Sequence, residues 1–110
     1  MATPFACDMT AIPAEERGAH HALIRRLMDK TVQTISELRD GLAFRFPAEA
    51  YDEVTEFVRR ERLCCPFLTF TLEVSPDRGP LLLRLTGAEG VKEFIRAELK
   101  LPTSGRSSSG

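Results

Sequence analysis

The sequence predicts an α+β fold, a two-layer sandwich in which helices cover one face of a mostly antiparallel sheet. Three observations lead to this prediction. Apolar residues recur at helical spacing in three separate stretches of the chain. Between those stretches, apolar and polar residues alternate as they do in half-buried strands, and turn-forming residues separate the neighbouring runs. The expected order of elements is β-α-β-β-α-β-β-α, in a single domain that spans residues 1–101.

The first strand of this order is the short apolar segment from Phe5 to Met9, which we expect to be an edge strand or an extended arm. Pro13 follows, with a carboxylate two residues later, and this pattern is typical of a helix N-terminus. The first helix should extend from Pro13 to about Lys30. Its predicted buried stripe consists of His20, Leu23, Ile24, Leu27 and Met28.

A β-hairpin is predicted after the first helix. Residues 31–38 could continue the helix, but several of them are β-branched and favour a strand. The pair Asp40-Gly41 is followed by alternating apolar residues, which is a strong local signal for a hairpin. We therefore predict strands over residues 32–38 and 41–46.

The second helix is predicted from Pro47 to about Leu63, because Pro66 disfavours helical geometry in the residue before it. Its expected buried residues are Tyr51, Val54 and Val58, with Phe57 buried in part. Alternating runs over residues 68–74 and 81–86, separated by a turn, predict a second hairpin. The open face of the sheet should be polar, through Arg45, Thr69, Thr71, Glu73 and Arg84.

The last helix is predicted from a capping box formed by Thr86 and Glu89. Its buried stripe should consist of Val91, Phe94, Ile95 and Leu99. Residues 102–110 bury too little apolar surface to offset the entropy of ordering, and they are predicted to be a disordered tail. Their Ser- and Gly-rich composition is typical of a segment added for expression.

Composition argues against two classes of partner. With 15 basic and 16 acidic residues, the chain has a net charge of −1 and no basic surplus for nucleic acid or an anionic membrane. No apolar run approaches the roughly 20 residues that span a bilayer, and the N-terminus lacks the features of a signal peptide. We expect a cytoplasmic protein with reduced thiols. A free sheet edge leaves a homodimer as an alternative, and no protein partner is indicated.

The three cysteines are the candidate functional residues. Cys64 and Cys65 lie where the second helix meets a strand, and Cys7 lies near the N-terminus. Helical geometry predicts that Cys65 is buried and Cys64 is accessible on the flank. The negative end of a helix dipole raises the pKa of a thiol, which argues against a highly reactive nucleophile.

Three functions are compatible with these thiols. The first is the binding of a soft metal or metalloid ion by Cys7, Cys64 and Cys65, because thiolates select thiophilic ions. The second is a redox response in which Cys7 forms a reversible disulfide with Cys64 or Cys65. The third is a small interaction module in which the cysteines are inert core residues.

Three sulfur ligands suit an ion of low coordination number better than tetrahedral zinc. Zinc would need a fourth ligand, and the candidates are Asp8, His20 and His21. The two histidines are adjacent, so they cannot chelate one ion from a regular helix. No catalytic motif is present and no catalytic residue is predicted, which argues against an enzyme.

Several local motifs occur along the chain, namely Ala6-Cys7-x-x-Thr10, Phe46-Pro47, Glu61-Arg62-Leu63-Cys64-Cys65-Pro66-Phe67, Thr69-Phe70-Thr71-Leu72 and Leu85-Thr86-Gly87. Together these motifs resemble a family of small bacterial proteins for which no activity is established. The resemblance covers about Phe5 to Ile95 and implies that Cys7, Cys64 and Cys65 occur together as a set, with no catalytic residue.

Overall fold

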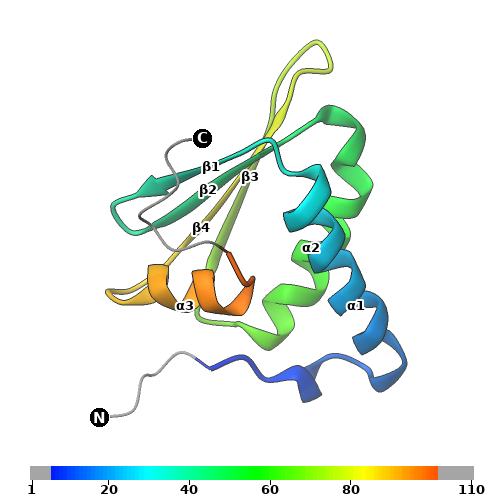
Figure 1. Ribbon diagram of the computed structural model, residues 1–110, viewed down its shortest axis with the longest axis vertical. Helices are drawn as coiled ribbons and strands as arrows, with labels where there is room; N and C mark the ends of the chain where they lie inside the picture. The colour runs from blue at the N-terminus through cyan, green and yellow to red at the C-terminus, as the bar shows by residue number, and fades with distance from the viewer. Residues whose placement is uncertain (1–5, 102–110) are drawn as a thin grey trace.

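A computed structural model describes residues 6–101 of the chain, which form an α+β fold with three α-helices and a four-stranded antiparallel sheet (Figure 1). The helices are α1 (Ala14–Arg26), α2 (Tyr51–Cys64) and α3 (Val91–Glu98). The strands are β1 (Thr34–Leu38), β2 (Gly41–Phe46), β3 (Thr69–Val74) and β4 (Leu81–Thr86). Shorter helical turns are η1 (Met9–Ala11), η2 (Leu27–Thr31) and η3 (Ala48–Ala50).

The N-terminal strand of the predicted order is wrong for the described residues, so the order is α-β-β-α-β-β-α. Phe5 lies outside the described residues, and residues 6–8 form an arm that leads into η1. The Asp8 carboxylate caps this turn by accepting from the backbone N–H of Thr10 at 3.1 Å. The backbone of Asp8 is still extended, but the chain leaves this geometry in the 3₁₀ turn that begins at Met9.

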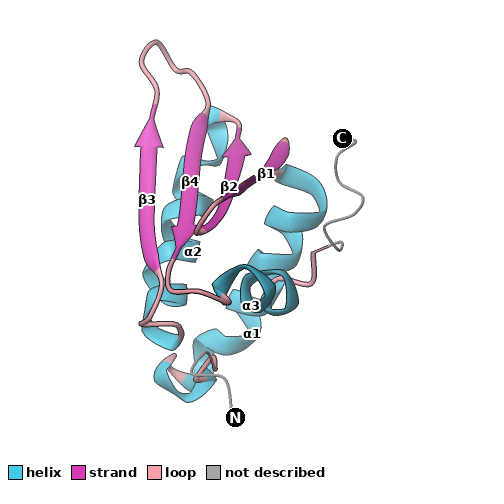
Figure 2. Ribbon diagram, turned by 90° about the vertical axis from the view of Figure 1, so that its left-hand side faces the viewer, coloured by secondary structure: helices cyan, strands magenta, loops and turns pink. Residues whose placement is uncertain are grey.

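The sheet has the order β1-β2-β4-β3, so each hairpin supplies one central and one edge strand (Figure 2). The predicted hairpin between β1 and β2 is confirmed, although β1 begins at Thr34. This strand begins two residues after the predicted position 32, because α1 continues into η2 up to Thr31. The π-turn η2 is closed by a hydrogen bond from the Val32 N–H to the Leu27 carbonyl at 2.8 Å.

Gly41 is the first residue of β2, where the predicted second strand begins. It lies opposite Thr86 of β4. A Cβ atom at this position would lie 1.9 Å from the Leu85 carbonyl oxygen. A glycine is therefore required here for the close approach of two backbones.

The core lies between the sheet and the helices. The predicted alternation is confirmed in β4, where Leu81, Leu83 and Leu85 are buried between half-buried residues. In β2 the apolar residues Leu42, Phe44 and Phe46 are buried as predicted, but Ala43 between them is buried too. The predicted stripe of α1 and η2 is also buried throughout. The outward residues of the strands are exposed or half-buried as expected, namely Arg45, Thr69, Thr71, Glu73 and Arg84.

The buried face of α2 differs from the prediction. Tyr51 is 48% exposed and Val58 is half-buried, whereas Val54 and Phe57 are completely buried. The observed stripe continues from these two residues to Glu61, which is only 1% exposed, and to the end of the helix. The prediction failed because a buried carboxylate is rare unless it is paired, so the pattern of apolar residues excluded Glu61 from the core face.

The predicted capping box at α3 is wrong. The helix begins at Val91, and its N-cap is Gly90 with a left-handed φ of 94° and no side-chain cap. A glycine adopts this conformation without the strain that a side chain would add. The buried residues Val91, Ile95 and Leu99 agree with the predicted stripe, and Phe94 is half-buried.

Candidate metal centre

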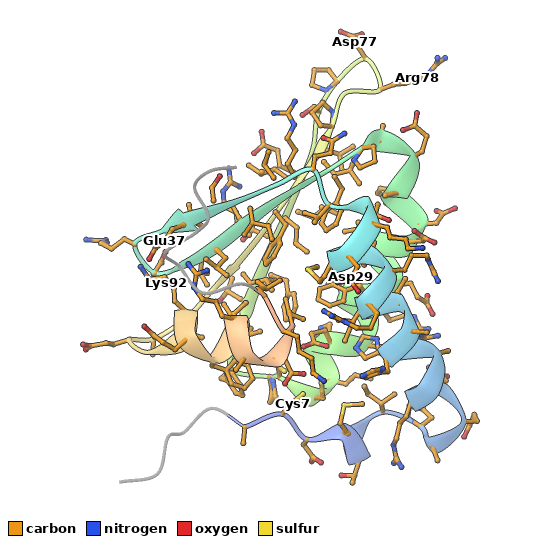
Figure 3. All side chains as sticks on the ribbon, viewed as in Figure 1. Cys7, Asp29, Glu37, Asp77, Arg78 and Lys92 are labelled. Carbon is orange, nitrogen blue, oxygen red and sulfur yellow. The ribbon has the colours of Figure 1, made fainter. Side chains whose placement is uncertain are left out.

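The C-terminal end of α2 meets the N-terminal arm, and this contact brings the three cysteines together. Cys64 is the last residue of α2, and Cys65 leaves helical geometry with φ −127° and ψ 66°. The backbone N–H of Asp8 donates to the carbonyl of Cys64 at 2.9 Å. This bond satisfies a carbonyl that a helix end leaves without an intrahelical partner. It also fixes the neighbouring Cys7 beside the helix terminus (Figure 3).

The three sulfur atoms form a compact triangle. The Sγ atom of Cys7 lies 2.8 Å from that of Cys64 and 3.2 Å from that of Cys65. The two adjacent cysteines have their sulfur atoms 3.7 Å apart. Cys64 and Cys65 are fully buried, and Cys7 is partly exposed. The prediction that Cys64 would be accessible is therefore wrong, because the arm and α3 cover the flank of the helix on which it lies.

Glu61 extends the triangle with a carboxylate from the preceding turn of α2. Its Oε1 atom is 3.8 Å from Cys64 Sγ, and its Oε2 atom is 3.4 Å from Cys65 Sγ. This contact follows from helical geometry, since residues three and four positions apart lie on one face. The Oε1 atom is also 2.8 Å from Nε2 of His20, a fully buried residue of α1. The histidine therefore contacts the carboxylate and not the sulfur atoms.

Glu98, the last residue of α3, is the fifth member of the group. One donor atom from each of Cys7, Glu61, Cys64, Cys65 and Glu98 lies within 4.8 Å of all the others, and we call these five residues the cysteine cluster. Glu98 also borders a cavity of about 220 Å³. The other residues that line this cavity are Met9, His21, Ile24, Arg25 and Lys100.

The acid groups of the cluster have strongly shifted pKa values. Hydrogen bonds from the thiols of Cys65 and Cys7 stabilise the Cys64 thiolate and lower its pKa to about 5. Hydrogen bonds with Cys64 and Cys7, together with burial, raise the pKa of Cys65, and the bond to Cys64 raises the pKa of Cys7. Burial and a hydrogen bond with Cys7 raise the pKa of Glu98 to about 7. Cys64 is therefore the most acidic of the three thiols.

The lowered pKa of Cys64 differs from the expectation that the helix dipole would raise the pKa of a thiol here. Its main causes are the hydrogen bonds with Cys65 and Cys7. Arg59 and Arg60 of α2 pair instead with the carboxylates of Glu16 and Glu56. The cluster thus offers a cation three sulfur atoms and two carboxylate oxygens, and thiols release their protons when they bind a metal ion.

The structure brings together the three predicted cysteines but adds none of the three predicted extra ligands. The Asp8 carboxylate is exposed and caps η1. His20 lies behind Glu61, and His21 is exposed on the next position of α1. The residues that the sequence analysis missed are Glu61 and Glu98. The position of Glu98 beside the arm depends on how α3 packs, and no local pattern predicts it. Glu61 could have been found, because it lies three and four positions before the two adjacent cysteines and so shares a helix face with them.

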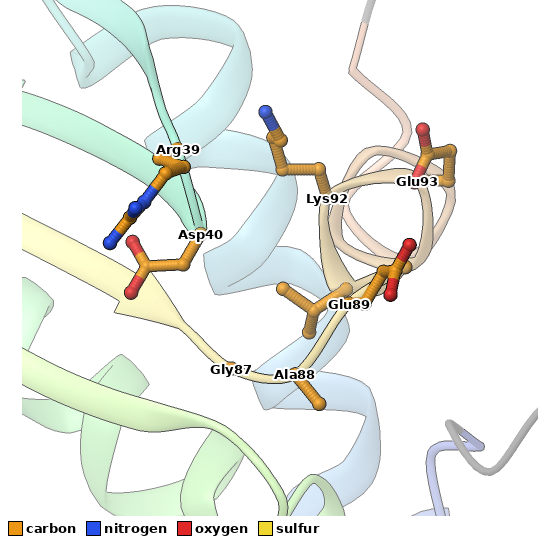
Figure 4. A pocket seen from close by; sticks show the side chains of 9 residues that line it. Arg39, Asp40, Gly87, Ala88, Glu89, Lys92 and Glu93 are labelled. Carbon is orange, nitrogen blue, oxygen red and sulfur yellow. The ribbon is translucent and has the colours of Figure 1, made fainter.

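Other hollows in the described part of the chain lack a comparable set of donors. A pocket of about 400 Å³ lies between the β1–β2 turn and the start of α3 (Figure 4). Arg39 and Lys92 line it together with Asp40, Glu89 and Glu93, so its charges are mixed. Among the described residues, the cysteine cluster is the group of His, Cys, Asp and Glu side chains that could hold a metal ion.

Two further findings concern the chain as a whole. In residues 6–101, no helix has both the length and the apolar character needed to cross a membrane. Comparisons with protein-family models, curated proteins and solved structures gave no match. The resemblance to a family of small bacterial proteins therefore stays a prediction. The function has to be inferred from the geometry and chemistry of the cysteine cluster.

Proposed function

We propose that the protein binds a thiophilic metal or metalloid ion, with Cys7, Cys64 and Cys65 as sulfur ligands. The observation that carries this proposal is the convergence of five donor atoms, three sulfurs and two carboxylate oxygens, within 4.8 Å of one another. The donors come from the arm, α2, the residue after α2, and α3. Only the folded chain assembles them, so the ion and the fold should stabilise each other.

The chemistry of the donors supports a thiophilic ion. Thiolates select ions such as Hg(II), Cd(II), Zn(II) and trivalent arsenic over hard ions such as Mg(II). The burial of Cys64, Cys65 and Glu61 also fits a cation, because buried acidic groups are costly unless a positive charge or hydrogen bonds compensate them. Inert cysteines that act as small hydrophobic residues would not require two carboxylates beside them.

A titration of the reduced protein tests this proposal. Adding Cd(II) or Hg(II) should produce thiolate-to-metal absorption in the ultraviolet that saturates at one ion per chain. The same titration of Cys7→Ser should give a weaker band and a lower affinity, because one sulfur ligand is lost. An unchanged titration of Cys7→Ser would refute the three-sulfur site, and the absence of a saturable band in the wild type would refute ion binding altogether.

A second candidate function is a reversible disulfide, and the short distances from Cys7 to Cys64 and Cys65 favour it. A hydroperoxide would take two electrons and two protons from a pair of thiols, forming the S–S bond, water and an alcohol or a second water. Peptide mapping after peroxide treatment would identify the bond. Prior loading with Cd(II) should protect the thiols if both chemistries use the same residues.

A further inference from the structure

We propose that His20 positions Glu61 so that one carboxylate oxygen becomes the fourth ligand of the bound ion. The site then selects four-coordinate divalent ions, such as Zn(II), Cd(II) and Co(II), over trivalent arsenic. This inference rests on the proposed function and narrows it to one class of ion. It also revises the expectation that three sulfurs alone would favour an ion of low coordination number.

The two oxygen atoms of Glu61 have different partners. The Oε1 atom is 2.8 Å from His20 Nε2, whereas the Oε2 atom is 3.4 Å from Cys65 Sγ. The imidazole therefore holds Oε1, which also lies 3.8 Å from Cys64 Sγ, and leaves Oε2 as the oxygen nearer to a sulfur atom. The Sγ atom of Cys65 is within hydrogen-bonding distance of Oε2 and of the other two sulfur atoms. Once an ion has replaced the thiol protons, Oε2 binds that ion while Oε1 stays with His20.

His20 is suited to this role by its burial and its hydrogen bonding. Its side chain is completely buried, and its ring stacks on that of Phe57 with centroids 6.0 Å apart and planes at 24°. Within the described residues, its Nδ1 atom is buried and has no hydrogen-bond partner. The tautomer with hydrogen on Nε2 therefore leaves no buried N–H without an acceptor, and it donates to Glu61. An apolar ring could fill the same buried space beside Phe57, so packing by itself does not require a histidine at position 20.

The fourth ligand determines which ion is preferred. Zinc and cadmium bound by sulfur ligands are commonly tetrahedral, and three sulfurs plus one carboxylate oxygen complete that geometry. Trivalent arsenic is satisfied by three thiolates and keeps its lone pair, so it gains nothing from a carboxylate. Contacts made by partners of a ligand typically change metal affinity by about 10- to 100-fold. The affinity for divalent ions should depend on His20, and that for arsenic should not.

The test compares Co(II) and trivalent arsenic in matched variants. The visible absorption of Co(II) reports coordination number, and tetrahedral Co(II) gives an intense band. His20→Phe keeps the ring and its packing but removes the donor, and we expect it to lower Co(II) affinity by about 10- to 100-fold and to weaken the tetrahedral band. His20→Gln should restore both in large part, because its amide can donate to Oε1. His21→Phe is the control, since it makes the same change at the adjacent exposed position.

Arsenic affinity of the same proteins separates the possible outcomes. We expect His20→Phe to bind trivalent arsenic within about twofold of the wild type, since that ion uses only the sulfurs. Equal losses for Co(II) and arsenic would mean that His20 merely supports the fold, and would overturn the proposal. Glu61→Gln should reproduce the Co(II) defect, whereas a defect confined to Glu98→Gln would assign the fourth ligand to Glu98 instead.

A failure of the proposed function would look different. If the wild type binds neither Co(II) nor arsenic with saturation, the ion site itself is refuted. If it binds both but His20→Phe binds Co(II) as tightly as the wild type with the same spectrum, only the role of His20 is refuted. The thermal unfolding midpoint and circular dichroism spectrum of each variant show whether it is folded. If His20→Phe does not fold, the comparison of His20→Gln with Glu61→Gln decides the question in the same way.

Discussion

The core beneath the sheet and the cysteine cluster are both largely closed to solvent, but they are built from different groups. Phe44, Phe46 and Leu83 pack under the sheet with no polar atom to satisfy. The cluster instead places thiols beside the nearly fully buried carboxylate of Glu61. Burial of apolar surface stabilises the fold, whereas burial of acidic groups costs free energy. The first region stabilises the structure, whereas the second is a group of side chains that could hold a metal ion.

The largest effect should come from the apolar region. Phe44→Ala removes a fully buried ring from a central strand and should lower the free energy of unfolding by about 3 to 5 kcal/mol. Urea denaturation followed by circular dichroism measures this loss. The fraction that remains folded should still bind one Cd(II) per chain. A loss below about 0.5 kcal/mol would mean that the face of the sheet has been misassigned.

An ion bound at the cysteine cluster should raise the free energy of unfolding of the protein. With free Cd(II) at 100 times its dissociation constant, the free energy of unfolding should rise by about 2.7 kcal/mol. Chelation of the ion should reverse this gain. Cys7→Ser should show little gain at the same Cd(II) concentration. Equal stabilisation of the wild type and Cys7→Ser in thermal unfolding would place the ion elsewhere.

The affinity for the ion should rise with pH. The pKa values of Cys7 and Cys65 are raised, so both are thiols at neutral pH and must lose their protons when they bind. Cys64, with a pKa lowered to about 5, adds a third proton only in more acidic solution. Between about pH 6 and about pH 8 the affinity should increase up to about tenfold per unit for each proton released, or about 1.4 kcal/mol, and Glu98, whose pKa is raised to about 7, titrates in the same window. Calorimetry in buffers of different ionisation enthalpy would count the protons, and a pH-independent affinity would exclude thiolate ligands.

Converting the polar pair behind the cluster into apolar core should stabilise the ion-free protein. Glu61→Leu alone should be destabilising, because it leaves both ring nitrogens of His20 buried without a partner. Adding His20→Phe should recover this loss and bring stability to the wild-type level or up to about 1 to 4 kcal/mol above it. Chemical denaturation of the two single variants and the double variant measures the coupling. A double variant less stable than both single variants would show that the pair contributes to folding and not only to binding.

The smallest expected effect concerns two valines one turn apart on α2. Val54 is fully buried, whereas Val58 is half-buried beside a surface pocket. Val54→Ala should cost about 2 kcal/mol, and Val58→Ala should cost less than about 1 kcal/mol. Neither change should alter Cd(II) affinity. If Val58→Ala proved the more costly, the buried face of α2 would be the one predicted from the sequence.

The sequence by itself determined the features that depend on near neighbours in the chain. The buried stripe from His20 to Met28, the alternation in β4 and both hairpins could be predicted, because helices and strands repeat with fixed periods and turns have local signals. The cysteine set was also predicted as the candidate site. The sequence failed where local rules compete, as at Gly90, which caps α3 in place of the predicted Thr86 and Glu89.

Only the tertiary structure decided how the site is built. Cys7 reaches Cys64 across 57 positions of the chain because the arm is bonded to the end of α2. Glu98 arrives from α3, and His20 from α1 meets Glu61 of α2. No periodic pattern in the sequence predicts these contacts between separate elements, because they depend on how each packed helix is rotated about its own axis. The rotation of α2 also places the Glu61 carboxylate on the buried face of the helix, where it contacts His20. A sequence pattern that treats every charged residue as exposed cannot predict this burial, because it depends on a partner from another helix.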